Sequence, residues 1–201
     1  MTKNNTYQNC VIENVLAMSA EKNNYNIAKR EWEYRGEVLD HGPIKDQIPK
    51  PAECQFCGHK IRYGYRLHNN INQKTVEVGS ECIGNYLEIT PTLATALDAD
   101  KRAAKKRRKN EQIKMRRDLY NSALVELRKV RIAICAIDNC QNDRNYILSA
   151  GNNASNLYSA LTSGEIDRLA EKYGVILDRE KIDAFVEEAG KVKVVDRITA
   201  F

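Results

Sequence analysis

Three features of the 201-residue sequence predict an α+β fold. Residues 53–87 combine a C-x-x-C-G knuckle with two strand-like segments. Residues 91–138 contain no glycine and no proline after Pro91, and helix formers dominate them. From residue 143 onward, short helical segments alternate with glycines. We therefore expect residues 1–90 to form an N-terminal helix and a small β domain. Residues 91–140 should form one long helix, and residues 141–201 a small helical region.

The part of the chain before the knuckle should supply a helix and a third strand. Apolar residues recur at three- and four-residue steps over 7–20, which predicts a helix. Residues 31–39 predict a strand that extends the hairpin into a three-stranded sheet. We expect Trp32, within this strand, to be a core residue rather than a base-stacking one. Residues 41–51 contain three prolines and predict a stiff loop.

A β-hairpin is predicted directly after the knuckle. Apolar and polar residues alternate over 60–67, and residues 75–78 have the composition of a return strand. The asparagine-rich residues 69–73 supply the turn. A hairpin of this length leads the chain away from the knuckle and back. Cys82, at the start of a predicted helix, should therefore arrive beside residues 54–57.

Cys54, Cys57 and Cys82 are predicted to bind one metal ion. Two cysteines in C-x-x-C spacing can direct both sulfurs toward one cation only from a tight turn. Gly58 removes the Cβ that would crowd this turn. Cysteine thiolates in such a set are the usual ligands of tetrahedral structural zinc, so Zn is the predicted cofactor. The alternative is that these cysteines are three unrelated buried thiols.

The fourth ligand of such a site is expected to be His59, which lies two residues after the knuckle. His68 is at the far end of the first predicted strand, roughly 25 to 30 Å away at ~3.3 Å per residue, which excludes it. His41 can reach the site only if the following loop doubles back. Glu81 and water are the remaining alternatives.

The C-x-x-C-G knuckle, the hairpin and a ligand on the following helix resemble a treble-clef or zinc-ribbon-like finger. The strings C-x-x-C-G-H-x-I-x-Y and V-G-S-x-C-I are similar to those of poorly characterised zinc-binding proteins of phages and mobile elements. The resemblance covers residues 53–87 and implies a metal and a local fold. Asn85 stands where such fingers carry a further cysteine. Because these fingers serve nucleic-acid, protein and catalytic roles, the resemblance leaves the function open.

The predicted long helix has two different halves. Its second half has an apolar stripe for packing, and Cys135 and the nearby Cys140 are expected to be buried thiols without a metal. Its first half carries ten cations over residues 101–117 against one acid, Glu111, within a net charge of +5 for the chain. With two hairpin arginines, these cations form the predicted nucleic-acid surface: Lys101, Arg102, Lys105, Lys106, Arg107, Arg108, Lys109, Lys114, Arg116, Arg117, Arg62 and Arg66.

Composition narrows the functional classes. The chain is 42% hydrophobic and has no run of eighteen apolar residues, so no membrane association is expected. Residues 1–9 are polar and carry no secretory pattern, which favours a reducing cytoplasm. Strings typical of serine hydrolases, metalloproteases, phosphate loops and zinc deaminases are absent, so an enzyme is not expected. A zinc-dependent enzyme with Glu81 as its base is the remaining catalytic alternative.

These observations favour a zinc-stabilised protein that binds DNA or RNA, mainly through sequence-independent phosphate contacts of the basic helix. Tyr63 and Tyr65 of the hairpin are candidates for stacking on unpaired bases. The alternative function is a phage- or mobile-element-type adaptor or inhibitor that binds an acidic host protein. A basic helix suits either partner, and a charge run is often only a solvated face.

Overall fold

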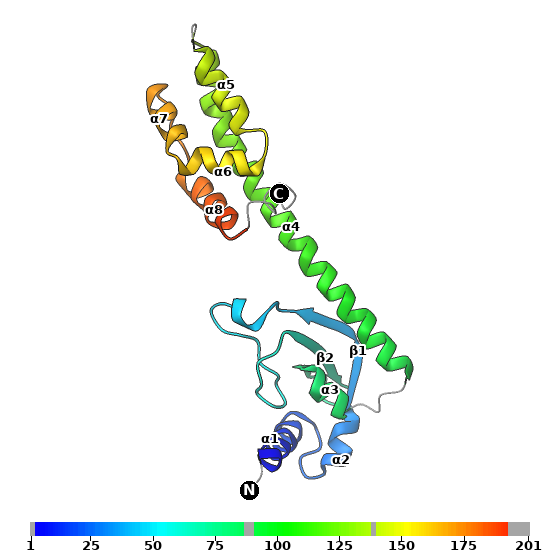
Figure 1. Cartoon of the computed structure of the whole chain (residues 1–201). Helices are drawn as coiled ribbons and strands as arrows, with labels where there is room; N and C mark the ends of the chain where they lie inside the picture. The colour runs from blue at the N-terminus through cyan, green and yellow to red at the C-terminus, as the bar shows by residue number, and fades with distance from the viewer. Residues whose placement is uncertain (1–2, 87–90, 138–139, 193–201) are drawn as a thin grey trace. The chain divides into compact units, whose positions relative to one another are not determined.

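The computed structural model describes residues 3–86, 91–137 and 140–192 (Figure 1). It contains a three-stranded antiparallel sheet, one long helix and several short helices, so the predicted α+β class is confirmed. Contacts divide the chain into two compact units, residues 1–109 (unit 1) and 110–201 (unit 2). Composition predicts boundaries at 90 and 140, whereas the contacts place one boundary inside the long helix. None of the described helices is long and apolar enough to cross a membrane.

The sheet of unit 1 has the strand order β1-β2-β3. Its strands are β1 (Trp32–Asp40), β2 (Tyr63–Asn69) and β3 (Thr75–Val78). Tyr65 in the central strand faces Val38 on one side and Val78 on the other, and all three side chains are buried. The register of β1 with β2 shifts between Tyr34 and Val38, which marks a bulge in the edge strand.

Strand β2 begins later than the predicted 60–67, because residues 60 and 61 are held by the knuckle loop. Glu53 and Lys60 form an isolated antiparallel bridge, and the Ile61 N–H donates to the Ala52 carbonyl at 2.8 Å. The return strand matches the predicted 75–78.

The N-terminal helices lie at the end of the sheet where β1 begins (Figure 1). They are α1 (Lys3–Met18), α2 (Tyr25–Ala28) and the 3₁₀ helix η1 (Lys29–Glu31), of which the sequence predicted only the first. Trp32 is a core residue, as predicted, and its ring meets Phe56 edge to face at 5.6 Å. Its indole N–H donates to the Ser19 hydroxyl at 2.8 Å. The core of unit 1 thus joins α1, the sheet and the knuckle.

Glu31 is a buried acid that ties three segments together. Its carboxylate accepts hydrogen bonds from the Ala20 and Glu21 N–H groups at 2.6 and 2.7 Å and from the Asn69 side-chain amide at 2.7 Å. Burial opposes ionisation, but these donors outweigh it and lower the pKa of Glu31. The carboxylate therefore links the end of α1, the start of β1 and the hairpin turn.

Helix α4 (Pro91–Cys135) is continuous, so a break near Asp118, which composition allows, does not occur. Its first part packs on β1: Leu97 and Ala104 are buried, and the Arg107 and Arg108 guanidiniums donate to the Val38 and Asp40 carbonyls at 2.9 and 3.2 Å. This contact explains why unit 1 extends to residue 109.

Unit 2 combines the second part of α4 with four short helices. These are α5 (Gln141–Ala150), α6 (Ala154–Thr162), α7 (Glu165–Lys172) and α8 (Arg179–Gly190). Their core includes Ile134, Leu157 and Phe185. Cys135, predicted to be buried, is exposed, because the preceding Ile134 takes the position that faces the core; Cys140 is half-buried.

Candidate metal centre

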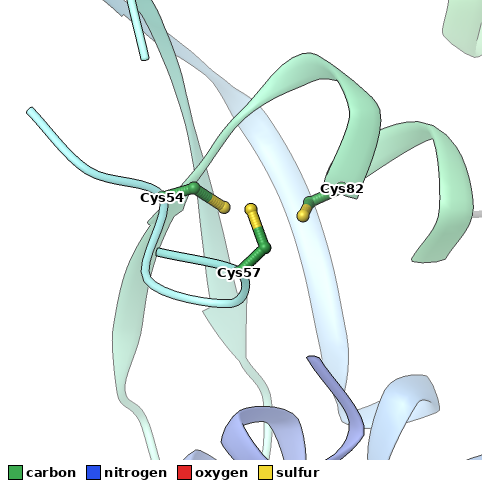
Figure 2. A group of neighbouring side chains, drawn as sticks. All are labelled: Cys54, Cys57 and Cys82. Atoms are coloured by element: carbon green, nitrogen blue, oxygen red, sulfur yellow. The ribbon is translucent and has the colours of Figure 1, made fainter. Parts of the chain in front are cut away.

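Three cysteine side chains of unit 1 point toward a common centre (Figure 2). The Sγ atoms of Cys54, Cys57 and Cys82, hereafter the cysteine cluster, all lie within 4.8 Å of one another. Cys54 and Cys82 are buried and Cys57 is half-buried. The predicted convergence of the three sulfurs is therefore present, and they lie close enough to hold one metal ion. Within the described ranges, no histidine or carboxylate completes this group to four ligands.

The knuckle is closed by backbone hydrogen bonds. The Gly58 N–H donates to the Cys54 carbonyl at 2.7 Å, and the Cys54 N–H donates to the His59 carbonyl at 2.8 Å. A Cβ at Gly58 would meet no described atom within 4 Å, so the predicted crowding of the turn is wrong; the φ of +74° is what disfavours other residues there and explains the glycine after C-x-x-C. The turn thereby holds both sulfurs on one side of the knuckle.

The third cysteine reaches the knuckle through the junction of β3 with α3 (Ser80–Tyr86). The Gln55 N–H donates to the Glu77 carbonyl at 2.9 Å, which fastens the knuckle alongside β3. Helix α3 begins at once, because the Ile83 N–H donates to the Gly79 carbonyl at 3.0 Å. Cys82 in its first turn is therefore directed at Cys54 and Cys57.

The close packing of the thiols changes their acidity. The pKa of Cys54 is lowered to about 5, mainly by a hydrogen bond with the Cys82 side chain, which outweighs burial, and further by backbone N–H groups. Burial raises the pKa of Cys57. One sulfur therefore ionises easily while its neighbours are held closely around it. Buried negative charge of this kind is stabilised by a cation, and thiolate sulfur suits zinc.

The three side-chain candidates for a fourth ligand, and the excluded His68, lie in different places. His59 and Glu81 are exposed and line the same cleft as the three sulfurs. His41 instead pairs through Nε2 with the Glu77 carboxylate, and His68 contacts Gln73 at 3.0 Å in the hairpin turn. Of these side chains, His59 and Glu81 are the ones that would complete the coordination of an ion held by the three sulfurs, with water as the alternative.

The cleft beside the cysteine cluster has a volume of about 420 Å³ and is hereafter called the tyrosine cleft, after Tyr63. Its walls come from the knuckle, the start of β2 and the first turn of α3. It is lined by Cys54, Cys57, His59, Lys60, Ile61, Arg62, Tyr63, Gly79, Ser80, Glu81 and Cys82.

Several cations of the predicted nucleic-acid surface bind acidic side chains or backbone carbonyls of the same chain. Arg62 pairs with Asp40 at 3.0 Å and Arg66 with Glu37 at 2.7 Å, and in unit 2 Arg116 pairs with Glu188 at 3.1 Å. Arg107 and Arg108 hold α4 on β1, as described above. Sequence spacing gave no signal for these partners, because each of them is distant along the chain.

Most of the remaining cations of the helix are exposed, whereas Lys101 is half-buried. Arg102, Lys105, Lys106 and Lys109, hereafter the basic stripe, follow one another at steps of three and four residues on one helical face. The opposite face holds the buried Leu97 and Ala104. None of the four stripe residues forms an ion pair within the part of unit 1 that the structure describes; Arg102 donates to the Asp98 carbonyl of its own helix at 3.3 Å. Lys114 and Arg117 of unit 2 are also exposed.

The two candidate stacking tyrosines have different environments. Tyr65 is 4% exposed and its ring lies 6.2 Å from that of Tyr34, so it belongs to the core and the prediction for Tyr65 is wrong. Tyr63 lines the tyrosine cleft. The alternating pattern of the strand could not show which of the two tyrosines is buried, because both lie on the same face of β2. Only the packing of neighbouring strands decides which side chain is covered.

Comparisons with known proteins find no matching family model, no matching curated protein and no matching solved structure.

Proposed function

We propose that the chain is a zinc-stabilised nucleic-acid-binding protein that contacts the phosphate backbone without reading sequence. The observation that carries this proposal is the basic stripe: four cations share the solvent face of a helix whose opposite face is fixed to the sheet. Their spacing along the helix axis covers about 10 Å, and a nucleic-acid strand presents phosphates at a comparable density. Long cationic side chains meet phosphates well but discriminate base edges poorly.

Zinc is the proposed occupant of the cysteine cluster, on the evidence of its donor set. Three sulfurs converge and no carboxylate of the described chain joins them, which suits a thiophilic cation rather than calcium or magnesium. The ion would join the knuckle to α3 and so fix the loop that precedes β2. Its role in this proposal is to hold the fold of unit 1, with the contacts to nucleic acid made by other residues.

The test removes charge from the stripe without loosening the helix. Lys105, Lys106 and Lys109 change together to Gln, whereas Arg107 and Arg108 stay because they bind the carbonyls of β1. The matched control removes three exposed cations elsewhere in unit 1: Arg30, Lys45 and Lys74, also to Gln. Binding of duplex DNA and duplex RNA is measured by fluorescence anisotropy over a salt series.

For the parent we expect the logarithm of affinity to fall with the logarithm of salt concentration at a slope of about −3 to −4, since each phosphate contact contributes ~0.9. The stripe variant should lose about two to three units of this slope and bind all sequences more weakly, while the control keeps most of it. Equal binding by parent and stripe variant at low salt would show that the stripe is not the contact surface. If the zinc-loaded parent binds neither DNA nor RNA, the alternative function, an adaptor that binds an acidic protein, is favoured.

A further inference from the structure

The tyrosine cleft is large enough for a small ligand and has a lining unlike that of the basic stripe. Its volume of about 420 Å³ falls within the range of ligand sites. It offers one aromatic ring, that of Tyr63, together with the hydroxyl of Ser80 and the charges of Lys60, Arg62 and Glu81. An aromatic ring beside cations in a cleft suits a ligand with a flat face and an anionic group.

Two cations already lie on the Tyr63 ring. The Arg62 guanidinium carbon lies 4.9 Å from the ring centroid and the Lys101 ammonium 4.8 Å from it. Arg62 is anchored by Asp40, to which it donates from two nitrogens at 3.0 and 3.3 Å. Lys101 of α4 is not among the residues that line the cleft, and it has no carboxylate partner among the described residues, so its ammonium can leave the ring at small cost.

We propose that the tyrosine cleft binds an unpaired nucleotide of a nucleic-acid single strand, with its base stacked on Tyr63 and its phosphate met by Lys60. This inference rests on the proposed nucleic-acid function and adds the strand state that the site selects. A paired base is stacked on its neighbours and offers its flat face to no protein ring, whereas an unpaired base is free to stack on an aromatic side chain.

Charge balance makes stacking the main contribution at this site. The charge of Arg62 is offset by Asp40, and the lining includes one further cation, Lys60, and one acid, Glu81. The lining is therefore close to neutral, in contrast to the basic stripe, which has no acid among its four members. Binding in the tyrosine cleft should depend weakly on salt, while binding to the stripe depends on it strongly.

The experiment compares Tyr63→Leu with Tyr63→Trp in the zinc-loaded full chain. The probe is a labelled oligothymidylate of about ten nucleotides, within the site sizes of known single-strand grooves, and a duplex of equal length is the reference. The parent should prefer the single strand. Tyr63→Leu should weaken single-strand binding about 5- to 150-fold, the factor that a stacked base contributes, and leave duplex binding unchanged. Tyr63→Trp should keep the affinity.

The tryptophan variant also gives a direct signal. Trp32 is buried in the core and supplies a constant background, so quenching of fluorescence on addition of ligand reports the introduced indole. Quenching by oligothymidylate and by thymidine monophosphate, but not by inorganic phosphate, is expected if the base stacks. Quenching by inorganic phosphate to the same degree would assign the cleft to phosphate alone and overturn the proposal.

A second variant guards against a folding defect in Tyr63→Leu. Lys60 is exposed, and Lys60→Gln should fold normally and reduce the single-strand salt slope by about 0.7, the contribution of one phosphate contact. The inference is overturned if both variants, Tyr63→Leu and Lys60→Gln, bind the single strand as tightly as the parent. In that case the proposed function still stands if the stripe variant loses duplex binding. A parent that binds neither strand state overturns both.

Discussion

Replacing Cys82 by serine is expected to release the metal ion and to lower the melting temperature of unit 1 while leaving unit 2 unchanged. Cys82 is 1% exposed and supplies the only sulfur of the cluster that comes from α3 among the described residues. A serine hydroxyl is a poor zinc ligand, so the two knuckle sulfurs alone must hold the ion. The substitution changes one atom in a buried position, and its direct effect on packing is small.

The magnitude follows from linkage between binding and folding. A ligand present at ~1,000 times its dissociation constant stabilises the folded state by about 4 kcal/mol. Unit 1 comprises residues 1–109, and in a domain of about that size 1 kcal/mol shifts the melting temperature by about 4 to 8 °C. Loss of the ion should therefore lower the unit 1 transition by about 15 to 30 °C at this metal excess.

Differential scanning calorimetry together with metal analysis provides the assay. Unit 2 serves as an internal reference, because its core consists of residues from 123 onward. Cys135→Ser is the matched control, since Cys135 is exposed and lies outside the cluster. The control should keep one zinc per chain and both transitions. A chelator should lower the first transition of the parent and have little effect on Cys82→Ser.

The result that refutes this reasoning is a Cys82→Ser protein with full zinc content and an unmoved first transition. In that case the ion is held without α3, and the convergence of the three sulfurs has another purpose. If the purified parent contains no metal and Cys82→Ser still lowers the first transition relative to it, Cys82 acts by packing alone.

Two further substitutions test the buried acid of unit 1 and the core of unit 2. Glu31→Gln should destabilise unit 1 by about 1 to 3 kcal/mol at neutral pH, because a carboxylate that accepts from Ala20, Glu21 and Asn69 becomes a weaker, neutral acceptor. The folded-state pKa of Glu31 is lowered, so its contribution to the free energy of unfolding is present above about pH 4.5 and is lost as the pH falls through the folded pKa. Urea unfolding at pH 7 and pH 3 should therefore show that the difference in stability between the parent and the variant shrinks in acid. Phe185→Ala, which empties a fully buried position, should cost about 3 to 5 kcal/mol in the unit 2 transition alone, and an equal loss in both calorimetric transitions would contradict the independence of the two cores.

Local patterns in the sequence were sufficient for most of the secondary structure. Strand 75–78 has the predicted bounds, because its composition is a local signal. The short helix α2 was missed, since four residues show too little periodicity to be recognised. The start of β2 was misplaced because Lys60 and Ile61 bond to the knuckle, a contact that no periodicity reveals.

The candidate sites also combine features that local sequence predicted with features that depend on distant residues. The convergence of Cys54, Cys57 and Cys82 followed from a knuckle, a hairpin and a helix in sequence order. Counting charges indicated a basic helix but not which of its faces packs. The hydrogen bonds of Arg107 and Arg108 to β1 carbonyls depend on partners almost seventy residues away. Long-range partners of this kind require the tertiary structure.

Helix α4 contributes to both cores, and this has a consequence for how its middle remains helical. Residues 109–112, 114 and 115 are exposed, so almost two turns have little packing of their own. An isolated helix must first form a nucleus, with an unfavourable constant of about 10⁻³, before residues can be added. Here the packed turns around Ala104 and Ala123 supply that nucleus from both ends. The exposed turns need only favourable propagation, which Lys, Glu, Gln and Met side chains provide.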